Sequence, residues 1–264
     1  MRNNLVIVRA GDSSLHEGWL EGGDRNWDLI VSYFGDEPGR YETEGTLVIR
    51  SKGAKWPPLG EVIEDLNSSG ELDKYDYICL PDDDLRGTTL AFNTLFEYCA
   101  RYRLALAQPA LALGSYYSWP ITRQHRSSSL RWVNIVEAMA PTFRRDLLRK
   151  VYPEFRTTLS GWGHDAWWAA EVEEPDREIA IIDAAAVVHT RPVGGPNHTR
   201  VREAGLTPEK ELKEFLQRKG LEFPVPKTYG YVDIRENPVR HMRVLEESAN
   251  DDGHQLSLWV DSTG

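Results

Sequence analysis

Residues 75–85 read YDYICLPDDDL, and this segment decides the predicted fold. Its first half, from Tyr77 to Leu80, is a short apolar run that predicts a buried strand of an α/β sheet. Its second half places three carboxylates, Asp82, Asp83 and Asp84, where the strand runs out into a loop. In open α/β sheets, ligands bind beyond the carboxyl ends of the strands. The segment therefore predicts a sheet with a ligand site at its edge.

The Asp triplet allows two interpretations. Three neighbouring carboxylates repel one another unless a cation or a set of hydrogen-bond donors neutralises them. One interpretation is a divalent metal ion that clamps a diphosphate, and the other is a solvated acidic turn. We favour the metal, because a predicted buried strand directly precedes the triplet.

The rest of the chain alternates predicted strands with predicted helices. Apolar residues at helical spacing after Pro57 predict one helix, and Thr88 or Thr89 can cap a second. This alternation predicts an α/β fold. The predicted strands span residues 5–9, 27–34, 46–50, 77–80, 105–111, 133–138 and 179–188.

The 264-residue chain has a net charge of -10, with a pI of about 5.3. This acidic balance argues against a protein that binds nucleic acid, which would show a basic face. No run reaches 18 apolar residues, so we expect no transmembrane segment and a cytoplasmic protein, at most peripheral to a membrane. Cys79 and Cys99 fall in a predicted strand and a predicted helix, which indicates buried thiols.

Three further segments offer side chains for a ligand. Asp12 follows the first predicted strand and can meet a base or ribose, although a turn-forming Asp is the commoner role. Lys55 precedes the first predicted helix and can contact a diphosphate. Residues 112–132 form a predicted polar loop in which aromatic residues such as Trp119 are interleaved with arginines. This composition suits a sugar ring or an anionic acceptor, and the alternative is a mobile surface loop.

Residues 160–168, with the sequence SGWGHDAWW, form the second unusual segment. The glycines on either side of Trp162 let the backbone turn sharply, and Asp165 falls in the first turn of the predicted helix that follows. Aromatic rings beside a carboxylate suit a sugar site, to which His164 also belongs. The alternative is an aromatic corner of the core with a helix-capping Asp.

His189 ends the last predicted strand. Together with the Asp triplet it would complete a site of carboxylates and imidazole for a hard or borderline cation. If Asp84 and His189 are both ligands, their side chains should approach to within about 5 Å of each other.

The ordered set of Asp82-Asp83-Asp84, Gly161-Trp162-Gly163 with Asp165, and His189 resembles glycosyltransferases of the GT-A type. There, a D-x-D element binds the metal and nucleotide sugar, and a later strand-end His supplies another ligand. The Gly-Trp-Gly followed by an acid is similar to a motif of the inverting β-galactosyltransferases, which carry a longer acidic run. More closely, five blocks resemble an uncharacterised family of plants and bacteria grouped with the glycosyltransferases: residues 75–78, 108–111, 136–141, 161–163 and 187–189.

The resemblance covers roughly residues 47–195 and implies a role for each matching residue. Asp84 and His189 would ligate Mn²⁺ or Mg²⁺, and Asp82 would ligate it too or face the donor ribose. Asp165 would be the general base that activates the acceptor hydroxyl, with Glu137 as the fallback base.

The resemblance implies a GT-A-like, Rossmann-like fold for nucleotide-diphospho-sugar transfer, with a central, mixed but mostly parallel sheet flanked by helices. Independently of it, we expect a catalytic domain over residues 1–205, with a helical appendage and tail over residues 206–264 packed on it. The activity would be metal-dependent transfer, with inversion, from a nucleotide-diphosphate sugar to a glycan or other hydroxyl acceptor. We expect a UDP-sugar as donor, bound by Asp12, Lys55, Asp82 and Asp83, and an acceptor bound by Trp162, His164 and Trp119.

Two alternatives remain open. One is a non-catalytic carbohydrate-binding protein whose Asp triplet is structural. The other is a nucleotidylyltransferase on a related fold, although no glycine-rich loop with Arg or Lys follows the first predicted strand.

Overall fold

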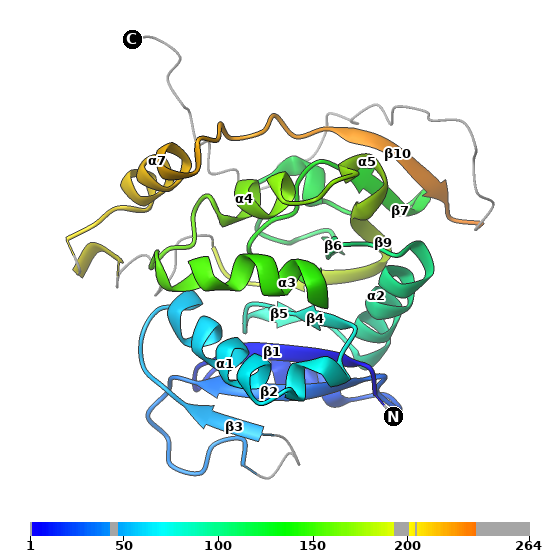
Figure 1. Ribbon diagram of the computed structural model, residues 1–264. Helices are drawn as coiled ribbons and strands as arrows, with labels where there is room; N and C mark the ends of the chain where they lie inside the picture. Colours follow the sequence, from blue (N-terminus) through cyan, green and yellow to red (C-terminus); the bar gives the residue numbers. More distant parts are fainter. Residues whose placement is uncertain (1, 43–46, 193–200, 204, 236–264) are drawn as a thin grey trace.

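The computed structural model describes residues 2–42, 47–192, 201–203 and 205–235 (Figure 1). The ten strands within these ranges form one sheet. In chain order they are β1 (Asn4–Ala10), β2 (Trp27–Tyr33), β3 (Leu47–Arg50), β4 (Tyr77–Cys79), β5 (Leu85–Arg86), β6 (Leu106–Leu111), β7 (Ser128–Val133), β8 (Thr142–Arg144), β9 (Ile179–His189) and β10 (Thr228–Asp233).

Helices lie on both sides of this sheet (Figure 1). The α-helices are α1 (Trp56–Ser68), α2 (Thr89–Tyr102), α3 (Arg145–Val151), α4 (His164–Ala170), α5 (Pro175–Glu178) and α7 (Pro208–Lys219). Short 3-10 helices are η1 (His16–Leu20), η2 (Glu71–Lys74), η3 (Pro120–Thr122) and η4 (Tyr152–Arg156).

The sheet is mixed but mostly parallel, as the sequence predicts. Its order is β10-β7-β9-β6-β8-β4-β1-β2-β3, and β5 pairs with β9 outside this path. Strands β3, β2, β1 and β4 are parallel neighbours, and β6 is parallel to β9. The short strand β8 lies between β4 and β6 and is antiparallel to both, so β4 and β6 point the same way. The carboxyl ends of β1, β4, β6 and β9 therefore meet at one edge of the sheet.

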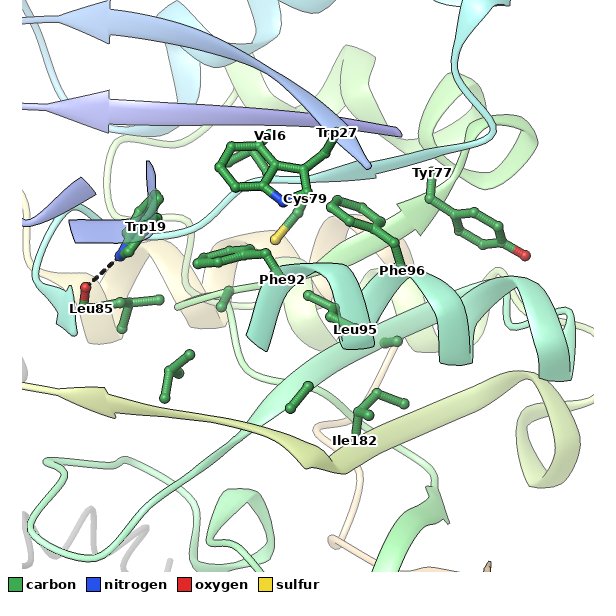
Figure 2. Close-up of a cluster of buried hydrophobic side chains, with 14 of the residues drawn as sticks. Val6, Trp19, Trp27, Tyr77, Cys79, Leu85, Phe92, Leu95, Phe96 and Ile182 are labelled. Carbon is green, nitrogen blue, oxygen red and sulfur yellow. Dashed lines mark hydrogen bonds between the residues drawn. The ribbon is translucent and has the colours of Figure 1, made fainter. Parts of the chain in front are cut away.

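The central strands are buried on both faces, which explains their nearly continuous apolar sequence. Along β1, Leu5 and Ile7 face the side covered by α1, α3 and α4, whereas Val6 and Val8 face the side covered by α2. Figure 2 shows Phe92 and Phe96 of α2 against Val6 and Cys79. Both cysteines are buried and free, as expected, and burial raises the pKa of Cys79 to about 12.

Two local predictions were wrong. The strand expected at residues 133–138 is instead β7, which ends at Val133, and the expected structureless loop contains η3 and most of β7. The sequence did not predict this strand because two of its buried residues, Ser128 and Arg131, are polar, whereas a buried strand is expected to be apolar. They are buried because Asp183 of β9 accepts hydrogen bonds from both, at 2.6 Å from Ser128 Oγ and at 2.9 and 3.0 Å from the Arg131 guanidinium.

The segment after residue 205 contributes to the sheet. Strand β10 pairs antiparallel with β7, and the Thr207 side chain caps α7 by accepting a hydrogen bond from the Lys210 backbone. The division at residue 205 stays a prediction. Thr46, expected to begin the third strand, lies outside the described residues, as do residues 236–264 of the expected appendage and tail.

We predict that Asp183→Asn lowers the free energy of unfolding by about 3 to 5 kcal/mol, because it leaves the buried charge of Arg131 uncompensated. Glu174→Gln, which breaks the exposed Arg177–Glu174 pair, should change it by less than about 0.5 kcal/mol. Urea denaturation measures both changes. A cost below about 1 kcal/mol for Asp183→Asn would contradict the role of this ion pair.

Candidate active site

A cleft of about 1260 Å³ lies at the edge of the sheet where the carboxyl ends of the strands meet. Its lining includes the Asp triplet after β4, His189 at the end of β9, and Glu137 from the connection between β7 and β8. The loop before α4 and one side of α7 complete it. Residues far apart in the sequence thus share one cavity because their strands are parallel.

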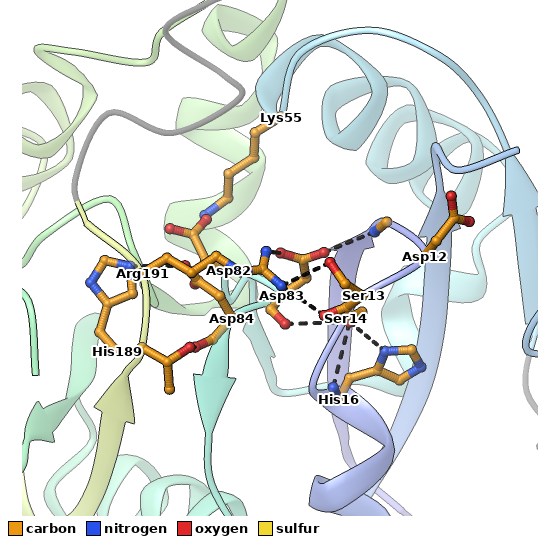
Figure 3. Close-up of polar contacts among 12 residues, drawn as sticks. Asp12, Ser13, Ser14, His16, Lys55, Asp82, Asp83, Asp84, His189 and Arg191 are labelled. Atoms are coloured by element: carbon orange, nitrogen blue, oxygen red, sulfur yellow. Dashed lines mark hydrogen bonds and ion pairs between the residues drawn. The ribbon is translucent and has the colours of Figure 1, made fainter.

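Asp84 and His189 meet in this cleft, as predicted. Strand β5 begins directly after the triplet and pairs antiparallel with the end of β9, with Leu85 opposite His189. Asp84 Oδ2 lies 3.4 Å from His189 Nε2 (Figure 3). A ligating atom of Asp82 joins them, and the three atoms lie within 4.8 Å of one another.

This group fits a divalent cation. Asp84 is buried, and its Oδ1 has no hydrogen-bond partner in the described part of the chain. His189 Nδ1 donates to the Tyr116 carbonyl oxygen at 2.9 Å, which turns Nε2 toward Asp84 as a metal ligand would be turned. Carboxylate and imidazole are both ligand types for divalent cations. Burial alone would lower the pKa of His189, but its contact with Asp84 and the charge of Asp82 raise this pKa to about 9.

Asp82 and Asp83 have different partners. Asp82 Oδ1 accepts a hydrogen bond at 2.6 Å from Nζ of Lys55, a residue of the cleft lining, which also donates to the Ala138 carbonyl oxygen at 2.8 Å. Asp83 instead accepts from the Gly11 backbone at 2.8 Å and pairs with Arg191 at 3.2 Å (Figure 3). The middle carboxylate therefore ties together the ends of β1, β4 and β9.

Asp165 lies in the first turn of α4, as expected, and opens into the same cleft. The preceding loop needs its glycines. Gly161 and Gly163 have positive φ angles of 75° and 94°, and a Cβ on Gly161 would collide with the indole of Trp56. Burial raises the pKa of Asp165 to about 7, and the charge of Glu137 adds to the rise, although the Ala166 backbone N–H donates to Oδ1 at 3.0 Å.

Glu137 is a second buried carboxylate in the cleft. Its Oε2 has no hydrogen-bond partner among the described residues. Burial raises the pKa of Glu137, and hydrogen bonds from Ser118 oppose that rise. Unlike Asp82, Asp83 and Asp84, neither Glu137 nor Asp165 has a described ion pair with Lys, Arg or His.

Two of the predicted site residues do not line the cleft. His164 is fully buried, with its ring among Trp56, Phe155 and Phe215, so its assignment to the acceptor site is corrected to a core position. One residue along a helix corresponds to about 100°, which turns His164 inward when Asp165 faces the cleft. Burial lowers its pKa to about 3.

Asp12 follows β1 but is turned away from the cleft and from the triplet (Figure 3). It accepts a hydrogen bond from the Tyr33 hydroxyl, which lowers the pKa of Asp12. The donor contact predicted for Asp12 stays a prediction, and in this structure the side chain joins the turn after β1 to β2.

Trp119 and Trp162 do line the cleft, in line with their predicted place. Sequence patterns missed the partner of Trp119: Phe223, after α7, stacks on its ring at 4.9 Å between centroids and 14° between planes. They also missed Arg191, although it follows His189 by two residues. A basic residue two positions after an expected metal ligand could have been predicted to lie at the site. No local sequence pattern could have predicted the pairing of Trp119 with Phe223.

None of the described helices is long and apolar enough to cross a membrane.

No protein-family model and no curated protein matches the sequence. Among solved structures, the chain is similar to Staphylococcus aureus TarS 1-349, a glycosyltransferase of the GT-A type, with a TM-score of 0.51 and 9% identity. This alignment covers 70% of the present chain and 59% of that one. A second TarS structure aligns with a TM-score of 0.47 and 9% identity, over 76% of this chain and 38% of that one. The chain thus spans less than two thirds of either structure, and the likeness shows the fold, which is GT-A-like.

Proposed function

We propose that this chain is a metal-dependent glycosyltransferase that moves a sugar from a nucleotide-diphosphate donor to an acceptor hydroxyl. One observation carries the proposal: a single cleft, on a GT-A-like fold, holds both a metal-fitting group and two buried carboxylates that have no cationic partner among the described residues. Metal ligands alone would suit many binding proteins. A separate carboxylate that can take a proton is what transfer to a hydroxyl requires.

The donor would lie along the Asp triplet. A divalent cation held by Asp82, Asp84 and His189 would neutralise the charge that develops on the leaving diphosphate. Lys55 and Asp83 border the same part of the cleft. Lys55 would share its charge between Asp82 and the diphosphate, whereas Asp83 would keep the strand ends in place through Gly11 and Arg191. We propose a UDP-sugar as the donor.

The acceptor would lie on the other side, beside Trp162 and Trp119. Asp165 would take the proton from the acceptor hydroxyl as its oxygen attacks the anomeric carbon. Its pKa of about 7 suits a base that works near neutral pH. Glu137 is the alternative base, because it lines the same cleft and its buried Oε2 has no hydrogen-bond partner among the described residues. Direct attack of this kind would invert the anomeric configuration.

We predict that Asp84→Asn weakens Mn²⁺-dependent UDP binding by at least about 100-fold, because it removes a charged ligand while keeping the side-chain shape. Isothermal titration with UDP, with and without Mn²⁺, measures the effect. Asp36→Asn is the matched control, since Asp36 is 92% exposed and lies outside the cleft lining. Metal-independent UDP binding by the native chain would contradict the metal site. The absence of any UDP binding would instead favour a carbohydrate-binding protein.

We predict that Asp165→Asn lowers transfer by about 10²-fold to 10⁴-fold, the usual range for loss of a general base. UDP and Mn²⁺ affinity should stay unchanged, since Asp165 is not in the metal-fitting group. Glu137→Gln is the matched comparison and should cost less. The reverse order of the two effects would assign the base to Glu137, and a loss of UDP affinity in Asp165→Asn would make Asp165 a donor contact.

The pH dependence follows from the same carboxylate. Asp165 has to be ionised to accept a proton, so transfer should fall about tenfold per pH unit below roughly pH 7. Glu137→Gln removes a neighbouring negative charge and should move this midpoint to lower pH. Rates measured between about pH 5 and pH 9 give the midpoint. The same midpoint in the residual activity of Asp165→Asn would show that another group sets it.

A further inference from the structure

The cleft is larger than a nucleotide sugar alone requires. Its volume of about 1260 Å³ exceeds the roughly 300 to 1,000 Å³ of ordinary small-molecule sites. One part of the cleft is lined by α7 and by residues 221–226, which follow α7. These residues lead from α7 toward β10 (Figure 1). This part has room for a second ligand, next to the carboxylates that would act on a hydroxyl.

The side chains that line this part are mainly apolar, and we call them the apolar wall: Leu212, Leu216, Leu221, Phe223 and Val225. Leu212 and Leu216 are four residues apart and so share one face of α7. Val225 is 84% exposed, and Phe223 lies flat against Trp119. The polar residues of α7 that border the wall are exposed. Such a concentration of partly exposed apolar side chains along one wall of the cleft indicates a ligand group that they would cover.

The apolar wall is fixed to the loop that carries Trp162 and leads to Asp165. Glu211 of α7 is buried and accepts hydrogen bonds from the backbone of Leu159 at 2.8 Å and of Ser160 at 2.7 Å. Phe215 packs against Gly163 so closely that a Cβ there would lie 3.0 Å from its ring. A ligand on the wall therefore lies at a fixed distance from the candidate base.

Resting on the proposed glycosyltransferase function, we propose that the acceptor is an alcohol with an apolar body, aliphatic or aromatic, that lies on the apolar wall while its hydroxyl reaches Asp165. A plain oligosaccharide fits this wall poorly. Its hydroxyls would leave water for aliphatic side chains that offer no hydrogen bonds. An apolar body would gain from the same contact.

The test is calorimetric titration of the full chain, without metal or nucleotide, with methyl, butyl, octyl and phenyl β-D-glucopyranosides as monomers. The sugar is constant in this series, so differences report the aglycone. Affinity should rise by about two- to fourfold per added methylene between methyl and butyl. The octyl and phenyl arms distinguish an aliphatic from an aromatic body. Equal affinity for all four probes would overturn the proposal.

Two variants locate the effect. Leu216→Asn should weaken octyl glucoside binding by about tenfold and leave methyl glucoside binding unchanged. Leu90→Asn is the matched control, because Leu90 is 70% exposed on α2 and outside the cleft lining. Equal losses in both variants would mean nonspecific binding and overturn the proposal. UDP binding with Mn²⁺ but no dependence on chain length would overturn the acceptor inference alone. Octyl glucoside binding without any metal-dependent UDP binding would overturn the proposed function, and with it the acceptor inference that rests on this function.

Discussion

The candidate site depends on the pairing of two-residue strand β5 with the end of β9. This pairing sets Leu85 opposite His189 and so brings Asp84 to His189, although the two residues are 105 positions apart in the sequence. The parallel order of β1, β4, β6 and β9 supplies the edge at which they meet. Without the pairing, the triplet would be an acidic turn, and burying Asp84 would have no compensation.

Charge explains how the rest of the cleft is arranged. Each carboxylate of the triplet has a basic partner: Lys55 for Asp82, Arg191 for Asp83 and His189 for Asp84. Asp165 and Glu137 have no basic partner in the part of the chain that the structure describes, and burial raises the pKa of both. The cleft thus separates neutralised carboxylates, suited to hold a cation and its diphosphate, from carboxylates suited to take a proton. This separation supports transferase chemistry better than simple sugar binding.

Several candidate site residues lie where the sequence predicts them, at the end or the start of an element. The Asp triplet after β4, His189 at the end of β9 and Asp165 at the start of α4 were all predicted, because a strand end or helix start can be seen in local patterns. The prediction for His164 was wrong because neighbouring residues on a helix point in different directions, so that His164 faces the core when Asp165 faces the cleft. Strand β7 was not predicted because its polar residues are buried against Asp183. The apolar wall had no local signal, because α7 reaches the site through tertiary contacts of Glu211 and Phe215.

The central claim is that Asp82, Asp84 and His189 hold a divalent cation. The most direct test is a crystal structure of the chain with Mn²⁺ and UDP, in which the anomalous scattering of manganese locates the ion without reference to the protein. The account predicts a peak within about 2.5 Å of a carboxylate oxygen of Asp84 and of His189 Nε2, with the diphosphate bound to the same ion. A peak elsewhere, or bound UDP with no ion between these residues, would contradict it.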